Sequence, residues 1–367
     1  MNDKSVLETA LYSKHLAAGA TMGEEGRWRV PMRYGDAIAE VRCARQTASI
    51  FDISHVARFR IRGDGALDLV ERLCTADAAR QEDDTARYTL LCNERGGIVD
   101  HGWLMRAENF WLLCTESVTR EKTWQHIREM AADFDVKIDD QTERTTHMLL
   151  TGPKARGMLD GVLPVKPGSM ARGEIKVGSL MVARYIAARI GGCNEWCLEA
   201  VLPNMVATQA WRFITAKAGA NVFSPGGMTA RDVLRIESGL CRYGHELNET
   251  IDPATADLRW AVSLDHDFLG ADAIAQTLDK TPARQRVGLI FPPSVTAIPR
   301  QGAVVCDSEA EIGNVTSGTY SPTLDRVIAM AYVAADACEP GRELAVRSGD
   351  RPEPAVVATF PICRSGP

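Results

Sequence analysis

Apolar side chains recur along the chain with periods that change from segment to segment. Over residues 7–18 they follow helical spacing, and Gly19 ends the pattern. Residues 36–48 repeat this period, and Asp36 is placed to accept hydrogen bonds as the N-cap. We therefore predict two helices near the start of the chain. The side of the second helix expected to be buried consists of Ile38, Val41 and Cys43.

Strand patterns dominate the following segments. Apolar and charged residues alternate over 56–62, which predicts a half-exposed strand. Two apolar runs between Tyr88 and Met105 flank Gly96-Gly97. Because glycine reaches positive φ without steric cost, this pair predicts a hairpin turn. The pattern also predicts a strand over 109–115, helices over 66–74 and 117–134, and a strand-to-helix unit over 148–155.

Beyond residue 280 the pattern changes to short strands separated by turn residues. This spacing is typical of a small all-β barrel or sandwich. Strands and helices earlier in the chain do not alternate regularly, so we predict an α+β fold with a β domain at the C-terminal end. The strands expected there cover 286–291, 303–306, 312–317, 328–333, 343–346 and 355–360.

Composition narrows the class of protein. A chain of 367 residues is long enough for two or three domains, and 45% hydrophobic with 25% charged residues is ordinary for a globular protein. The net charge of -6, with both signs interspersed, excludes a basic surface for nucleic acid. We find no signal peptide and no apolar run approaching the roughly 18 residues of a membrane span. We expect a cytoplasmic protein without nucleic-acid or membrane partners.

The ten cysteines are scattered, and several lie in apolar runs, so we predict reduced, buried thiols. Cys193 and Cys197 form the one close pair, but their spacing is not that of a zinc ribbon, and we predict no metal. The sequence also lacks a Gly-x-Gly-x-x-Gly fingerprint, a Walker loop and a Gly-x-Ser-x-Gly elbow. Dinucleotide, phosphoryl-transfer and hydrolase functions therefore have no motif support.

Several blocks, in order and at compatible spacing, resemble the T-protein (aminomethyltransferase) family of the glycine cleavage system and its folate-dependent demethylase relatives. The resemblance extends from about residue 10 to the C-terminus. Its blocks are Phe51-Asp-Ile-Ser-His55, Tyr88-Thr-Leu-Leu-Cys-Asn-Glu with Gly-Gly-Ile-Val-Asp100, Thr151-Gly-Pro-Lys-Ala-Arg, Ala230 to Leu240 with Tyr243-Gly-His, Asp267-Phe-Leu-Gly, and Val315 to Pro322.

The resemblance implies a three-domain cloverleaf around a central cavity for tetrahydrofolate. The donor presents a carbon bound to nitrogen, oxygen or sulfur, and the protein orients the reactants. By position, Tyr88 and Tyr243 correspond to aromatic wall residues and Arg231 to the ligand-site arginine. The expected domains are 1–52 with 140–250, then 53–139, then 251–367 as linker and C-terminal β domain.

The catalytic hairpin departs from the family pattern. Asp100 matches the first Asp of the family's Gly-Gly-Ile-x-Asp-Asp turn, but the second, reactive Asp is His101 here. Aspartate with a pKa near 3.9 is a fixed anion at neutral pH, whereas histidine near 6.5 can act as base or acid. We predict His101 and Asp100 as catalytic residues. The alternatives are that His101 only hydrogen-bonds a backbone carbonyl at the strand end and that Asp100 is a carboxylate that stabilises the turn.

The segment that the resemblance assigns to folate binding also differs from the family pattern. The family's Thr-Gly-Tyr-Thr-Gly-Glu-Asp-Gly-Phe-Glu is rewritten over 188–197, and alignment places Cys197 at the Glu that holds the pteridine edge. Losing its charge-assisted hydrogen bonds costs about 1.5–3 kcal/mol unless Glu195 or Glu199 substitutes. Changed residues at other ligand positions are Val56, Met105 and Glu116.

We therefore predict a tetrahydrofolate-dependent one-carbon transferase with an altered centre. The expected partner is a small methyl or methylene donor, with a lipoyl carrier protein as a further possibility. One alternative is an O-, N- or S-demethylase. The other is a non-catalytic folate-fold binding or regulatory protein, because fold does not determine function.

Overall fold

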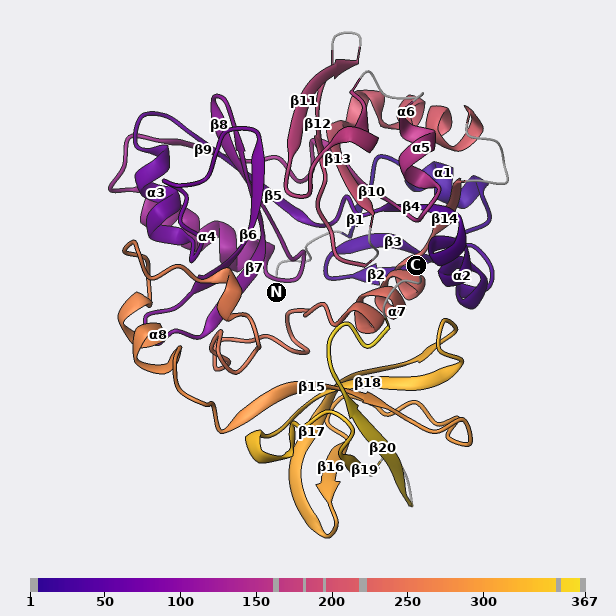
Figure 1. Ribbon diagram of the computed structural model, residues 1–367. Coiled ribbons are helices and arrows are strands. Elements are labelled where there is room, and N and C mark those ends of the chain that lie inside the picture. The colour runs from indigo at the N-terminus through magenta and orange to yellow at the C-terminus, as the bar shows by residue number, and fades with distance from the viewer. Residues whose placement is uncertain are drawn as a thin grey trace. The chain divides into compact units, whose positions relative to one another are not determined.

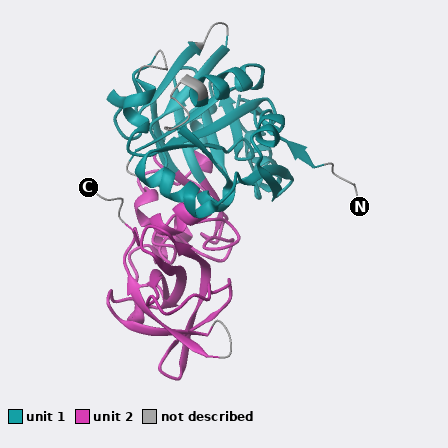
Figure 2. Cartoon of the chain, turned by 90° about the vertical axis from the view of Figure 1, so that its right-hand side faces the viewer, with its two compact units in different colours: residues 1–70, 78–88, 102–231 teal, residues 71–77, 89–101, 232–367 magenta. Residues whose placement is uncertain are grey.

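The computed structural model describes residues 6–160, 165–180, 183–193, 196–217, 223–347 and 351–363. The chain divides into two compact units (Figure 2). Unit 1 comprises Met1–Val70, Ala78–Tyr88 and Gly102–Arg231, and unit 2 comprises Glu71–Asp77, Thr89–His101 and Asp232–Pro367. The expected three-domain boundaries stay a prediction.

One sheet of unit 1 has the strand order β11-β12-β13-β10-β4-β14 (Figure 1). β10 pairs antiparallel with both β4 and β13, whereas β14 runs parallel to β4. The sheet therefore places segments far apart in sequence beside each other. Its strands are β4 (Ala48–Asp52), β10 (Thr145–Thr151), β11 (Ile175–Leu180), β12 (Ala183–Ala188), β13 (Cys197–Pro203) and β14 (Phe223–Gly226).

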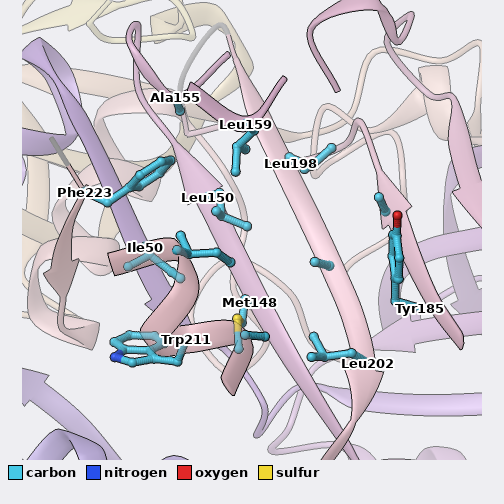
Figure 3. Packing of buried hydrophobic residues seen from close by; sticks show 14 of the residues in the cluster. Ile50, Met148, Leu150, Ala155, Leu159, Tyr185, Leu198, Leu202, Trp211 and Phe223 are labelled. Atoms are coloured by element: carbon cyan, nitrogen blue, oxygen red, sulfur yellow. The ribbon is translucent and has the colours of Figure 1, made fainter. Parts of the chain in front are cut away.

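Helices α5 (Ala155–Leu159) and α6 (Asn204–Lys217) contribute apolar side chains to one face of this sheet. Alternate residues of each strand point to that face, so Met148, Leu150 and Leu198 belong to one buried cluster with Trp211 of α6 (Figure 3). The residues between them point to the other face. That second face holds the polar residues described below.

A second sheet has the order β6-β7-β8-β5-β9. Its strands are β5 (Ala57–Arg62), β6 (Thr85–Cys92), β7 (Ile98–Ala107), β8 (Phe110–Thr115) and β9 (Lys137–Asp140). Helix α3 (Ala66–Leu73) and helix α4 (Arg120–Ala131) belong to this region, and Trp124 of α4 stacks on Phe59 at a centroid distance of 5.5 Å. The predicted hairpin around Gly96-Gly97 is confirmed as the β6–β7 connection.

Within unit 1 an apolar cluster joins residues of both sheets. Met105 and Leu112 of the second sheet pack with Ile186 and Val201 of the first. Half-buried Val56 contacts the same cluster. The remaining elements are β1 (Leu7–Glu8), β2 (Thr21–Glu25), β3 (Trp28–Arg33), α1 (Tyr12–Ala17), α2 (Ala37–Gln46), α7 (Met228–Ser238) and α8 (Ala271–Thr277).

The C-terminal strands of unit 2 close into a barrel in the order β15-β18-β17-β16-β19-β20. Buried valines and alanines such as Val305, Val333 and Ala355 fill it. The predicted C-terminal β domain and the α+β class are confirmed. The strands are β15 (Arg284–Ile290), β16 (Val304–Asp307), β17 (Ala310–Ser321), β18 (Arg326–Ala334), β19 (Glu343–Arg347) and β20 (Pro352–Ala358).

Two predicted helix details near the start were wrong. The helix expected over 7–18 is shorter, because Leu7–Glu8 pairs with β3 as a parallel strand before α1 begins. In α2 the predicted N-cap is confirmed, since Oδ1 of Asp36 accepts from the Ile38 amide at 3.0 Å. Ile38 itself is exposed, because the buried side of α2 is formed by Glu40, Val41 and Ala44.

Strand β5 is buried more deeply than its alternating pattern predicts. Arg58 has no exposed surface. Its guanidinium donates to the carbonyls of Ser54 at 3.0 Å and Thr145 at 2.9 Å, and also to those of Val56 and Thr142. A charged residue can be buried when its donors are satisfied in this way. Among the described residues, no helix is both long and apolar enough to cross a membrane.

Candidate functional site

The β6–β7 turn of unit 2 positions Asp100 and His101. Gly96 has a φ of 81°, and a Cβ on Gly97 would lie 1.9 Å from the Glu249 carbonyl oxygen. Oδ1 of Asn93 accepts from the Gly97 amide at 3.0 Å. Glycine is therefore required at this close approach. The turn fixes where β7 begins, and with it the place of the two candidate catalytic residues.

Asp100 and His101 are both buried on β7. Oδ1 of Asp100 accepts the backbone N–H of His101 at 2.8 Å. The carboxylate is therefore anchored to its own strand, while the imidazole belongs to the next residue and points to the opposite face. Their proposed catalytic roles stay a prediction.

In unit 1, His55 lies in the connection between β4 and β5 and is 1% exposed. Burial, followed by the charge of Arg231, lowers the pKa of His55 to about 3 against the opposing charges of Asp52 and Glu116. The imidazole is thus neutral at physiological pH. Its Nδ1 has no hydrogen-bond partner among the described residues. Such an orphaned buried nitrogen is free to meet a ligand.

Arg231 stands near the start of α7 and is half-buried. Its positive charge lowers the pKa of His55, of His147 and of Cys193. Three segments of unit 1 therefore lie within its electrostatic reach. Arg231 is the cation that the resemblance assigns to the ligand site.

Glu199 on β13 provides a carboxylate near this group. Its Oε2 lies 2.8 Å from Nε2 of His147 on β10. Burial lowers the pKa of His147 although Glu199 acts in the opposite direction. The pairing of Leu149 with Glu199 places both residues on the sheet face opposite α6. The sequence analysis did not predict His147 as a site residue. The one sequence feature that could have indicated it is its position as a polar residue directly before an apolar run.

Cys197, the position aligned with the pteridine glutamate, begins the same strand. Its thiol is 1% exposed and lies 3.2 Å from Oγ1 of Thr151. Cys197 and Glu199 are two residues apart and therefore point to the same face. Glu195 lies outside the described residues.

The other predicted ligand residues of unit 1 occupy different environments. Tyr88 is half-buried and makes an edge-to-face contact with Trp103 at a centroid distance of 5.5 Å. Met105 is buried in the cluster between the two sheets, which Val56 also contacts. Glu116 follows β8, half-buried, and its charge acts on His55.

In unit 2, Tyr243 is half-buried and its hydroxyl donates to Oε1 of Glu249 at 3.4 Å. Arg235 makes a largely buried network, in which its Nε donates to Oδ1 of Asp232 at 2.8 Å. Its Nη1 lies 2.8 Å from Oε2 of Glu246, and its Nη2 donates to Oγ of Ser317 at 2.8 Å. These contacts join α7 to β17 and give Arg235 a structural role.

Comparison with known proteins identifies the family. The family model of the GCVT N-terminal domain matches residues 11–266, and that of the glycine cleavage T-protein C-terminal barrel domain matches residues 284–363. The chain is 33% identical to an aminomethyltransferase of Symbiobacterium thermophilum, covering 99% of both chains. It is 35% identical to an aminomethyltransferase of Moorella thermoacetica, covering 97% of this chain and 98% of the relative.

A crystal structure of glycine cleavage system aminomethyltransferase T from Bartonella henselae has the same fold. It superposes with a TM-score of 0.91 at 28% identity, covering 98% of this chain and 99% of that chain. The predictions of a T-protein-type fold and of a transferase enzyme are confirmed. The chain belongs to the glycine cleavage T-protein family.

Proposed function

We propose that this protein transfers a methylene or methyl group from a small donor to tetrahydrofolate. The supporting observation is the family match along nearly the whole chain, together with the retained Arg231. Relatives that match over their full length carry the name aminomethyltransferase. The assignment as a transferase rests on these relatives. The use of tetrahydrofolate as acceptor and the kind of donor are our proposal.

The residues of unit 1 have the chemistry that a reduced folate requires. A pterin ring presents N–H donors along one edge, and its glutamate tail carries carboxylates. Glu199 supplies an acceptor for the first and Arg231 a cation for the second. The orphaned Nδ1 of His55 adds a neutral polar group in the field of Arg231. Tyr88 offers an aromatic ring for stacking.

We propose that Glu199, instead of Cys197, holds the pteridine edge. A thiol that is 1% exposed and in contact with Thr151 is a weak hydrogen-bonding group. Glu199 lies on the same face of β13 and keeps a carboxylate, whose Oε2 lies 2.8 Å from Nε2 of His147. The apparent loss of the family glutamate then reduces to a shift of two residues in the alignment.

We propose that Asp100 and His101 of the hairpin take part in proton transfer. Tetrahydrofolate supplies the nucleophilic nitrogen that accepts the one-carbon unit. Oδ1 of Asp100 accepts the His101 amide, which anchors this carboxyl group to β7. A ring nitrogen of His101 can take up or release a proton near neutral pH.

The donor is the open part of the proposal. A lipoyl carrier protein of the glycine cleavage type is one candidate, because T-proteins form the family. His101 favours the other candidate, demethylation of a small amine, ether or thioether, because a titrating group has replaced the fixed anion. Both donors deliver the carbon to the same acceptor.

Calorimetric titration with tetrahydrofolate tests the acceptor. We expect saturable heat that Arg231→Ala weakens by at least roughly tenfold and Glu199→Gln by roughly 10- to 150-fold, the scale of lost charge-assisted hydrogen bonds. Arg212→Ala, which removes an exposed arginine of α6 in the same unit, is the matched control and should bind normally.

Two results would contradict this proposal. Absence of saturable binding at millimolar tetrahydrofolate would remove folate from the function. Normal binding by Glu199→Gln together with weakened binding by Cys197→Ser would return the pteridine contact to Cys197. Circular dichroism of each variant establishes that it is folded before its affinity is compared.

A further inference from the structure

Cys193 and Cys197 are each held through their backbone carbonyl by an arginine. Nη1 of Arg45 on α2 donates to the Cys193 carbonyl at 2.8 Å. Arg189, which directly follows β12, places its guanidinium 5.1 Å from the Trp196 ring centroid and donates to the Cys197 carbonyl at 3.4 Å. Both cysteines therefore have backbone anchors.

The two thiols are in contact. Sγ of Cys193 lies 3.8 Å from Sγ of Cys197, while a disulfide bond measures about 2.05 Å. Gly191, at a φ of 108°, permits this approach, because a Cβ there would lie 2.8 Å from Cβ of Cys197. A small displacement of one side chain closes the remaining gap. All ten cysteines of the chain are free thiols in this structure.

Cys193 is the more reactive member of the pair. The hydrogen bond with Cys197, followed by the charges of Arg231 and Arg45, lowers the pKa of Cys193 to about 7 against burial and the charge of Glu199. The lowered pKa favours the thiolate of Cys193, which is the nucleophilic form. Cys193 is also the more exposed of the two, at 5% against 1%. A small oxidant can therefore reach it first.

We propose that Cys193 and Cys197 form a reversible redox site that hydrogen peroxide oxidises to a disulfide. The Cys193 sulfur attacks one peroxide oxygen, the O–O bond breaks, and the leaving hydroxide takes the thiol proton as water. The Cys197 sulfur then attacks the resulting sulfenic acid, the S–O bond breaks, and a second water forms. Two thiols lose two electrons and two protons, and peroxide becomes two waters.

Mass spectrometry of the oxidised protein tests the site directly. Trypsin releases both cysteines in one peptide covering residues 190–212, which contains no other cysteine. After peroxide treatment this peptide should lose two hydrogen atoms and both of its alkylation sites, and dithiothreitol should restore them. If it stays fully reduced while other cysteines oxidise, or if Cys193 pairs elsewhere, the proposal is overturned.

Single-cysteine variants distinguish the attacking thiol, Cys193, from the resolving thiol, Cys197. In Cys197→Ser the sulfenic acid of Cys193 cannot be resolved, so dimedone should label the peptide several-fold more than in Cys193→Ser. Equal labelling would contradict Cys193 as the attacking thiol. The matched control is Cys43→Ser, which removes a half-buried thiol of lowered pKa in the same unit and should leave disulfide formation intact.

The disulfide would also affect folate binding, and this consequence rests on the proposed function. Cys197 and Glu199 share a face of β13, so a bond at Cys197 shifts the strand that carries the carboxylate. Oxidised protein should bind tetrahydrofolate several-fold more weakly than reduced protein. Unchanged affinity would contradict only this coupling, whereas absent binding in the reduced state would contradict the proposed function.

Discussion

At the scale of single residues, His101 stands where the sequence resemblance leads us to expect a second, reactive aspartate. A free histidine titrates near neutral pH, whereas a free aspartate is ionised there. The proposed chemistry therefore depends on pH in a range where the family's usual acids do not titrate.

His101→Asn tests this role. If His101 is the general acid or base, turnover with the true donor should fall about 10²- to 10⁴-fold while the protein stays folded. The pH–rate profile should lose the ionisation that belongs to this imidazole. His126→Asn, which alters a half-buried histidine of α4, is the control and should keep turnover and profile. Unchanged kinetics of His101→Asn would leave His101 a structural residue.

At the scale of elements, the end of β4 is held by a buried polar network. Oδ2 of Asp52 accepts from Oγ1 of Thr9 at 2.7 Å and lies 2.8 Å from Nε2 of His15 on α1. Nδ1 of His15 is in turn 2.6 Å from the Tyr34 hydroxyl. Asp52 also receives the Ser54 amide at 3.0 Å. The network fixes the segment that carries His55.

Asp52→Asn should therefore destabilise the protein in a pH-dependent way. Despite burial, the hydrogen bond and charge of His15 together with bonds from Ser54 and Thr9 lower the pKa of Asp52 in the folded protein. Because this pKa is lower in the folded than in the unfolded protein, the ionised carboxylate stabilises the fold at pH values above the unfolded pKa of about 3.9. That stabilisation is lost as the pH falls through the pKa of the folded protein. Breaking such a buried pair costs about 3–5 kcal/mol.

Thermal unfolding measures this effect. The midpoint of Asp52→Asn should lie well below that of the wild type at pH 7, and the gap should narrow as pH falls below about 4. Asp64→Asn, at an exposed position between β5 and α3, should unfold like the wild type at every pH. If the difference between the two unfolding midpoints did not change with pH, Asp52 would stabilise the fold through the packing of its side chain and not through its charge.

At the scale of the whole molecule, both family models match in order, and the fold superposes along nearly the entire chain. This shared architecture leaves the donor open, because function depends on the residues of the site and not on the fold.

We accordingly expect poor activity in glycine cleavage. Supplied with the other purified components, the protein should form methylene-tetrahydrofolate far more slowly than an ordinary family member, because His101 replaces the reactive anion. His101→Asp should recover part of that activity. Rates comparable to those of an ordinary aminomethyltransferase would show that the exchange is neutral and that glycine cleavage is the function.

Local sequence decided much of the fold. The hairpin at Gly96-Gly97 and the N-cap at Asp36 depend on the backbone preferences of a few neighbouring residues, and the barrel strands depend on alternation over short runs. These signals act over less than ten residues, so they can be read without knowing the rest of the chain. The family blocks extended the prediction to the whole architecture.

The tertiary structure decided which residues from distant segments are in contact. The burial of Arg58, the pairing of His147 with Glu199 and the contact of the Cys193 and Cys197 thiols were not predicted from sequence. The first two depend on segments that are remote in sequence, and the third on anchors from Arg45 and Arg189. Because strand register and long-range packing decide such contacts, no local pattern encodes them.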